Sequence, residues 1–99
     1  MEISATDLKN RLSNSESLKI LDVREEIEYH TYNIGGTNIP LGMIRMVEDY
    51  NFNKSDEIIV VCQRGIRSRT ACHILESLGY LNTRNLTGGL TAMRRLNEY

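Results

Sequence analysis

Short apolar runs alternate with stretches of helical periodicity along the whole chain. Many of the apolar runs are rich in β-branched residues and are bounded by polar or glycine-containing segments, which is typical of strands. They lie at residues 2–3, 18–23, 37–39, 58–61 and 83–86. Strands that alternate with helices pair in parallel through right-handed crossovers. The pattern therefore predicts a three-layer α/β/α domain with a roughly five-stranded, mostly parallel sheet.

The segments between the strands carry the signals of helices. A capping box at residues 4–7 opens a helix that continues to about Leu12. Acidic residues at the start of 25–32 favour a second helix, because negative charge is stabilised at a helix N-terminus. Apolar positions within 71–78 form one helical face, and Gly79 is suited to end that helix. A final helix is expected after the Gly88-Gly89 pair.

A further helix is predicted after Pro40, which suits a first helical turn. Apolar residues then recur at every third position, and Met43 and Met46 lie beside this apolar row. Because methionine adapts to irregular gaps in cores, we expect both side chains to be core filler rather than a binding surface.

The longest uninterrupted apolar run, Ile58–Val61, leads directly into Cys62. Such a run is typical of a strand buried on both faces of a parallel sheet. Ligands of these sheets bind outside the carboxyl ends of the strands, which is where Cys62 stands. Gly65 can take the positive φ that turns neighbouring N–H groups toward one point, and a helix N-terminus follows. The stretch therefore predicts an anion-binding loop that carries a thiol.

The Cys62 thiol is expected to be exposed at the strand end and to ionise easily. Helix N-termini and nearby cations lower the pKa of a cysteine, and Arg64, Arg67 and Arg69 follow in the chain. The alternative is a structural cysteine, because free cysteine is often a small core residue. Cys72 lies within the next helix and is expected to be such a core residue, with a resolving thiol as its alternative.

Composition restricts the classes of function. The chain has 99 residues, enough for one small core, so residues 1–99 are assigned to a single domain. The net charge of −1 argues against nucleic acid or an acidic membrane as partner. Two cysteines without an export signal favour a reduced, cytoplasmic setting. No Cys/His spacing typical of zinc is present, so no metal site is predicted.

Four segments, in order along the chain, resemble the rhodanese family. Cys62–Ser68 is similar to the active-site loop of that family, Cys-x-x-Gly-x-Arg-Ser/Thr, and Leu21–Glu25 to its Asp-Val-Arg segment. Asn38–Leu41 resembles the Asn-Ile-Pro-Leu segment, and Leu86–Leu90 the closing Gly-Gly turn. The resemblance covers nearly the whole chain, and it implies a rhodanese-like domain with strand order 1-5-4-2-3.

The resemblance implies a rhodanese-type sulfurtransferase of the thiosulfate sulfurtransferase class, with Cys62 as catalytic nucleophile. A sulfane sulfur would pass from thiosulfate or a persulfide, through a Cys62 persulfide, to cyanide, a thiol or a sulfur-carrier protein. Neither a metal nor an organic cofactor is implied. Asp22 and Arg24 are expected to form an ion pair that braces the loop. The residues implied to bind substrate are Gln63, Arg64, Gly65, Ile66, Arg67 and Ser68.

One segment departs from the family pattern. Many rhodaneses have Gly-His-Ile before Asn-Ile-Pro, whereas this chain has Thr31-Tyr32-Asn33. Residues 28–36 instead resemble the rhodanese domains that are fused to adenylyltransferases in sulfur-carrier pathways. This departure leaves the loop chemistry intact and concerns only the subgroup.

Two other functions stay open. The domain can be a non-enzymatic module that binds sulfur or regulates a partner, because a fold does not determine a function. It can also be a phosphatase or arsenate reductase of the same fold, which carries a Cys-x5-Arg loop. Here only four residues separate Cys62 from Arg67. A tetrahedral oxyanion needs a wider ring of donors than one sulfur atom, so the shorter loop favours sulfur.

Overall fold

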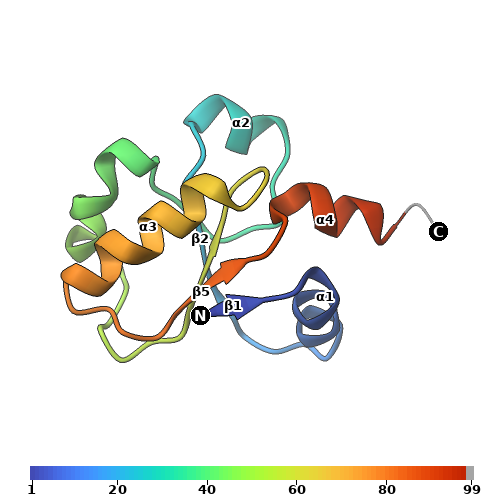
Figure 1. The fold of residues 1–99 in the computed structure, drawn as a ribbon, viewed down its shortest axis with the longest axis horizontal. Helices are drawn as coiled ribbons and strands as arrows, with labels where there is room; N and C mark the ends of the chain where they lie inside the picture. Colours follow the sequence, from blue (N-terminus) through green and yellow to red (C-terminus); the bar gives the residue numbers. More distant parts are fainter. Residues whose placement is uncertain (98–99) are drawn as a thin grey trace.

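The computed structural model describes residues 1–97 and is shown as a ribbon in Figure 1. Its strands are β1 (Glu2–Ile3), β2 (Lys19–Asp22), β3 (Thr37–Asn38), β4 (Ile58–Val61) and β5 (Thr83–Leu86). Its α-helices are α1 (Ala5–Ser13), α2 (Glu26–Thr31), α3 (Ile66–Ser77) and α4 (Gly89–Arg95). A 3₁₀-helix, η1, spans Leu41–Asp49. All five predicted strands are present, and each lies within its predicted range.

The five strands form one sheet in the order β1-β5-β4-β2-β3, and every neighbouring pair is parallel. The predicted fold class and the strand order implied by the resemblance are therefore confirmed. In the register of β2 and β4, Asp22 stands opposite Val61. This pairing brings the residues that follow the two strands, Arg24 and Cys62 among them, to the same edge of the sheet.

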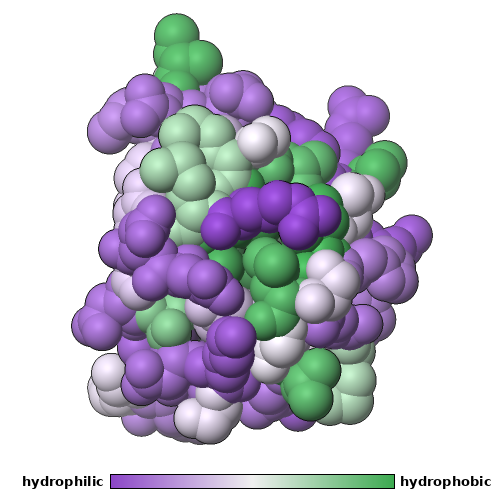
Figure 2. Space-filling model, turned by 90° about the vertical axis from the view of Figure 1, so that its left-hand side faces the viewer, coloured by the Kyte–Doolittle hydropathy of each residue, from purple (hydrophilic) through white to green (hydrophobic). Residues whose placement is uncertain are grey.

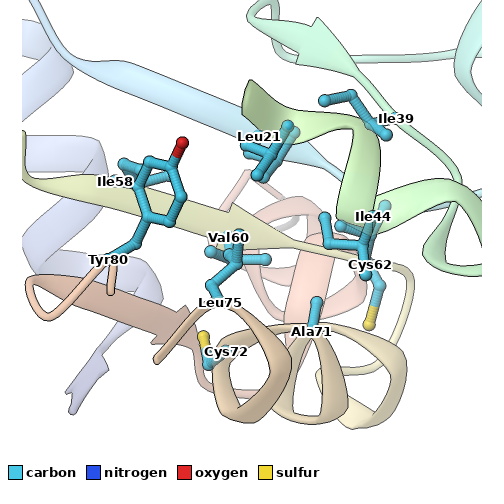
Figure 3. Packing of buried hydrophobic residues seen from close by; sticks show 12 residues of the cluster. Leu21, Ile39, Ile44, Ile58, Val60, Cys62, Ala71, Cys72, Leu75 and Tyr80 are labelled. Atoms are coloured by element: carbon cyan, nitrogen blue, oxygen red, sulfur yellow. The ribbon is translucent and has the colours of Figure 1, made fainter. Parts of the chain in front are cut away.

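The sheet divides the core into two layers because alternate side chains of a strand point to opposite faces. On one face, Ile58 and Val60 pack with η1 and α3, as part of the cluster in Figure 3. On the other face, Ile59 and Val61 pack with α1 and α4. All four side chains of β4 are fully buried, and each such burial contributes about 1.5–3 kcal/mol to folding. The strand that leads to Cys62 is thus the central strand of the sheet, and its side chains contribute to the core on both faces.

The expectation that the two methionines of 41–49 fill the core is wrong. Met43 is 49% exposed and Met46 is 43% exposed, whereas Ile44 and Val47 are buried. The segment is a 3₁₀-helix with three residues per turn, so every third position faces the sheet and the positions between point outward. Figure 2 looks onto this side of the molecule, where apolar surface lies among strongly hydrophilic side chains.

Residues 1–97 contain no helix whose length and apolar character would let it cross a membrane.

Candidate active site

The loop after β4 turns sharply at Gly65. This residue is the N-cap of α3 and has φ of 89°, which is left-handed backbone that favours glycine. A Cβ atom there would also lie only 3.1 Å from the carbonyl oxygen of Leu86 and from the backbone nitrogen of Gly88. The predicted role of Gly65 in shaping the loop therefore has two causes, its φ angle and the closeness of the chain after β5.

The start of α4 holds the other side of the loop. The backbone N–H of Leu90 donates to the carbonyl oxygen of Cys62 at 2.9 Å, and that of Thr91 donates to Gln63 at 3.0 Å. The Gln63 side-chain amide donates in turn to the Thr91 hydroxyl at 3.0 Å. A Cβ atom at Gly89 would collide with the Gln63 carbonyl. The Gly-Gly turn thus lets the backbone of α4 approach the loop closely.

Hydrogen-bond donors converge on the sulfur of Cys62. The N–H of Gly65 lies 3.1 Å from Sγ and the N–H of Ser68 lies 3.3 Å from it. The Ser68 hydroxyl oxygen is 3.2 Å from Sγ. Burial by itself raises the pKa of the thiol, but the bonds from Ser68, Arg64 and Gly65 outweigh it and lower the pKa below its ordinary value. The loop therefore favours a thiolate.

Two expectations about this thiol need correction. Cys62 is 1% exposed, so it is buried rather than displayed at the strand end. It lies in the wall of a cavity of about 350 Å³, which is lined by Glu28, Cys62, Gln63, Arg64, Ile66 and Arg67. Of the two predicted causes of the lowered pKa, the N–H groups at the start of the helix act on the sulfur, and the causes that lower the pKa are hydrogen bonds rather than the charge of the arginines. Short-range donors are stronger here than partly hydrated cations.

Asn85 completes the surroundings of the sulfur, and the sequence did not point to it. It is buried on β5, its Oδ1 accepts a hydrogen bond from the Ser68 hydroxyl, and its Nδ2 donates to the Gly65 carbonyl at 3.2 Å. Ser68 has one hydroxyl proton, so it can donate to Asn85 while Cys62 is a thiol and to Sγ once Cys62 is a thiolate. β5 has three polar residues and only one apolar residue, so nothing in its sequence marked Asn85 as the buried amide beside the loop.

Arg67 lies at the cavity but is already paired. Its two terminal nitrogens donate to the two carboxylate oxygens of Glu28 at 2.7 and 2.9 Å. Glu28 also accepts the N–H of Glu25 at 3.1 Å, which is part of the capping box of α2. The bond from Arg67 lowers the pKa of Glu28 to about 2, so the carboxylate is ionised at every ordinary pH. The acidic residues of α2 had been explained by the helix dipole alone, so this contact was not predicted.

The remaining predicted loop residues differ in their surroundings. Arg64 and Ile66 are exposed and line the Cys62 cavity, while Gln63 is half-buried against α4. Gln63 and Glu28 also line a neighbouring cavity of about 290 Å³. The structure therefore brings the predicted loop residues together around the sulfur, with the Ser68 side chain buried behind it.

Asp22 and Arg24 form the expected ion pair, at 2.8 Å and almost fully buried. Arg24 also donates to the carbonyl oxygen of Tyr32 at 2.6 Å, at the end of α2. The side-chain amide of Asn38 donates to the carbonyl oxygens of both members of the pair. The pair thus braces α2 and β3 rather than the Cys62 loop itself. Removing one partner would leave a buried charge uncompensated, at a cost of about 3–5 kcal/mol.

Cys72 lies inside the core on α3 and is 6% exposed. Burial raises the pKa of its thiol. This placement agrees with the interpretation of Cys72 as a small core residue.

Comparisons with known proteins identify the same family over nearly the whole chain. The sequence pattern of the rhodanese-like domain matches residues 4–96. The chain is 37% identical over 90 residues to YrkF of Bacillus subtilis, a proposed sulfur carrier protein. The match includes 90% of this chain and 48% of that protein. It is 32% identical to a sulfurtransferase of Allochromatium vinosum, with 95% of the chain and 88% of the relative covered.

Two further comparisons concern the fold and the subgroup. A crystal structure of a rhodanese-like domain protein from Staphylococcus aureus superposes with a TM-score of 0.81 at 33% identity, covering 94% of this chain and 91% of that one. An adenylyltransferase and sulfurtransferase, uba4 of Ogataea parapolymorpha, is 31% identical over 86 residues, which are 86% of this chain and 22% of that protein. The predicted likeness to rhodanese domains of such adenylyltransferases is confirmed.

Proposed function

The chain belongs to the rhodanese-like domain family, and on this premise we propose that it is a sulfurtransferase that works through a persulfide on Cys62. Its relatives include proteins named as sulfurtransferases, which supports sulfur transfer in general. The observation that carries the finer proposal is the convergence of two backbone N–H groups and one hydroxyl on the Cys62 sulfur.

In the first step the Cys62 thiolate attacks the outer sulfur of the donor. A bond forms between the two sulfur atoms, and the bond from the outer sulfur to the rest of the donor breaks. Its electron pair leaves as sulfite when the donor is thiosulfate, or as a thiolate when the donor is a persulfide. No external oxidant is needed. The product is an anionic persulfide, and donors already aimed at the loop centre stabilise its charge.

In the second step an acceptor removes the outer sulfur. Cyanide, a thiol or a cysteine of a protein such as a sulfur carrier attacks that sulfur, and the electron pair returns to Cys62 as thiolate. The two half-reactions share one site, so ping-pong kinetics are expected. Arg67, Arg64 and Gln63 are proposed to contact the part of the donor or acceptor that is not transferred.

Intact-protein mass spectrometry tests the proposal most directly. Thiosulfate or a small persulfide should add the mass of one sulfur atom to the wild-type protein, cyanide should remove it, and Cys62→Ser should not acquire it. An aryl phosphate should not be hydrolysed. Phosphatase turnover that depends on Cys62, without a sulfur adduct, would overturn the proposal in favour of a phosphatase. A stable adduct that no acceptor removes would instead favour the non-enzymatic sulfur-binding module.

A further inference from the structure

Glu28 has a position at the Cys62 cavity that the proposed mechanism does not use. Among the described residues that line this cavity, it alone is acidic. It also lines the neighbouring cavity with Arg24 and Arg94, so its side chain stands between the two spaces. Its partner in the Cys62 cavity is Arg67, the loop cation expected to meet the anionic end of a donor.

The pair of Glu28 and Arg67 is bidentate and accessible. Both oxygens of the carboxylate accept bonds from the guanidinium, and the two side chains are 33% and 37% exposed. A sulfonate or a second carboxylate would use the same fork of N–H donors. An anionic donor therefore meets a cation whose best hydrogen-bonding geometry is already taken.

Resting on the proposed sulfurtransferase function, we propose that Glu28 is a specificity-determining residue that disfavours dianionic donors. Its carboxylate occupies the Arg67 guanidinium, so thiosulfate must displace it, whereas a persulfide with an uncharged organic part has no need of Arg67. The sulfur-transfer step is the same for both donors. What differs is the electrostatic work of bringing the donor to the loop.

Charge and geometry both support this competition. The bond from Arg67 lowers the pKa of Glu28 to about 2, and the ordinary value of 4.5 still leaves the carboxylate ionised at neutral pH once a donor has displaced it. Arg24 and Arg94 line the other cavity that Glu28 borders, so a displaced carboxylate meets positive charge there. It nevertheless remains close to the bound donor, and one unit charge a few ångströms from a partly hydrated dianion changes binding on the order of tenfold. The residue thus weakens thiosulfate binding without closing the site.

Glu28→Gln tests the proposal with little disturbance of α2. Glutamine keeps a side-chain oxygen that can accept the Glu25 N–H of the capping box, but it removes the charge. The measurement is the rate at which the sulfur adduct appears on Cys62, against the concentration of thiosulfate and, separately, of an alkyl persulfide whose organic part is uncharged. We expect the ratio of the two second-order rates to shift about tenfold toward thiosulfate, through tighter binding, and less at high salt.

Glu26→Gln is the matched control. Glu26 lies on the same helix, is exposed, and lines neither cavity bordered by Glu28, so the variant changes net charge by the same amount without touching Arg67. Its donor ratio should equal that of the wild type. A change in Cys62 reactivity itself would alter the rates for both donors and cancel in the ratio.

The outcomes separate this inference from the function on which it rests. If neither donor loads Cys62 in the wild type, the sulfurtransferase proposal fails. If both donors load it and the ratio in Glu28→Gln equals that of the wild type, Glu28 has no part in donor choice. Should Glu28→Gln not fold, Glu28→Asp retains the charge but shortens the reach to Arg67. If the rate with thiosulfate divided by the rate with the persulfide is no higher in Glu28→Asp than in the wild type, the inference is equally overturned.

Discussion

The loop at the end of β4 and the middle of α3 each hold one buried cysteine, and the two thiols are shifted in opposite directions. Cys62 is 1% exposed and Cys72 is 6% exposed, and both belong to the same apolar cluster (Figure 3). Burial raises the pKa of both thiols. Cys62 has backbone N–H groups aimed at its sulfur, and together with the Ser68 hydroxyl they reverse the shift, whereas the Thr83 hydroxyl beside Cys72 does not outweigh burial.

Burial alone therefore does not make a cysteine structural. What separates the two thiols is the backbone around them, because the N–H groups within α3 are used in the helix whereas those at its start are free to point at a ligand. A thiolate kept from water by such donors is stabilised without being hydrated, which suits a group that must form and break bonds to sulfur.

The largest expected difference between the two regions is in transfer activity. Cys62→Ser should lower the rate of thiosulfate:cyanide transfer by on the order of 10³-fold or more, because the nucleophile is lost. Cys72→Ser should retain most of the activity. Steady-state assays on the two purified variants, with circular dichroism to verify folding, make the measurement. If both variants lost transfer activity equally, Cys72 would also take part in catalysis and the two cysteines would not differ in function.

The next effect concerns the hydrogen-bond donors around the Cys62 sulfur. Ser68→Ala removes the hydroxyl at 3.2 Å from Sγ and should move the alkylation profile of Cys62 toward higher pH. A hydrogen bond to a charged group is worth about 1.5–3 kcal/mol, so alkylation by iodoacetamide at neutral pH should slow about tenfold. Ser77→Ala, which removes an exposed hydroxyl at the other end of α3, is the control and should leave the profile in place. An unshifted profile in Ser68→Ala would leave only the backbone as the source of the low pKa.

A smaller effect is the pH dependence of stability, which should have opposite signs for the two thiols. The pKa of Cys62 is lowered on folding, so its contribution to the free energy of unfolding is full above the ordinary value of 9.0 and is lost as pH falls through the folded value. The pKa of Cys72 is raised, so its contribution is present below 9.0 and is lost as pH rises through the folded value. Each slope is at most about 1.4 kcal/mol per pH unit.

Urea denaturation of wild type, Cys62→Ser and Cys72→Ser at several pH values measures this. The stability of the wild type relative to Cys62→Ser should increase with pH up to about 9. Relative to Cys72→Ser it should decrease above that pH. Parallel curves for all three proteins would mean that neither thiol changes its pKa on folding.

The smallest effect is expected beside Cys72. Thr83 is buried there. Its hydroxyl makes no hydrogen bond of normal geometry among residues 1–97, and it lowers the pKa of the neighbouring Cys72 thiol by less than burial raises it. Thr83→Val replaces this hydroxyl with a methyl group of similar size, so the free energy of unfolding should stay the same or rise by up to about 1 kcal/mol. Transfer activity should not change. A clear loss of stability in thermal melts would show that the hydroxyl has a partner.

The sequence predicted what depends on neighbours along the chain. The apolar run of β4, the glycine at the loop and the start of α3 are local signals, and they placed Cys62 correctly at the sheet edge. Asn85 and Glu28 were missed because they reach the site from β5 and α2, through contacts between segments far apart in the sequence. The outward position of Met43 was missed because a 3₁₀-helix and an α-helix both repeat apolar residues at a spacing of three.

The position of β5 within the sheet has a consequence for how the protein is made. β5, the last of the five strands of this sheet to be synthesised, is inserted between β1 and β4, so the sheet cannot close until residue 86 has left the ribosome. Asn85, which holds Ser68, is made together with the rest of β5, and the start of α4, which holds the Cys62 loop, is made just after it. During elongation at about 5–20 residues per second, a nascent chain therefore contains Cys62 before the segments that hold its loop have been made. The surroundings of Cys62 are thus complete only when the domain is complete, and under the proposed function an unfinished chain would not yet be prepared to take up sulfur.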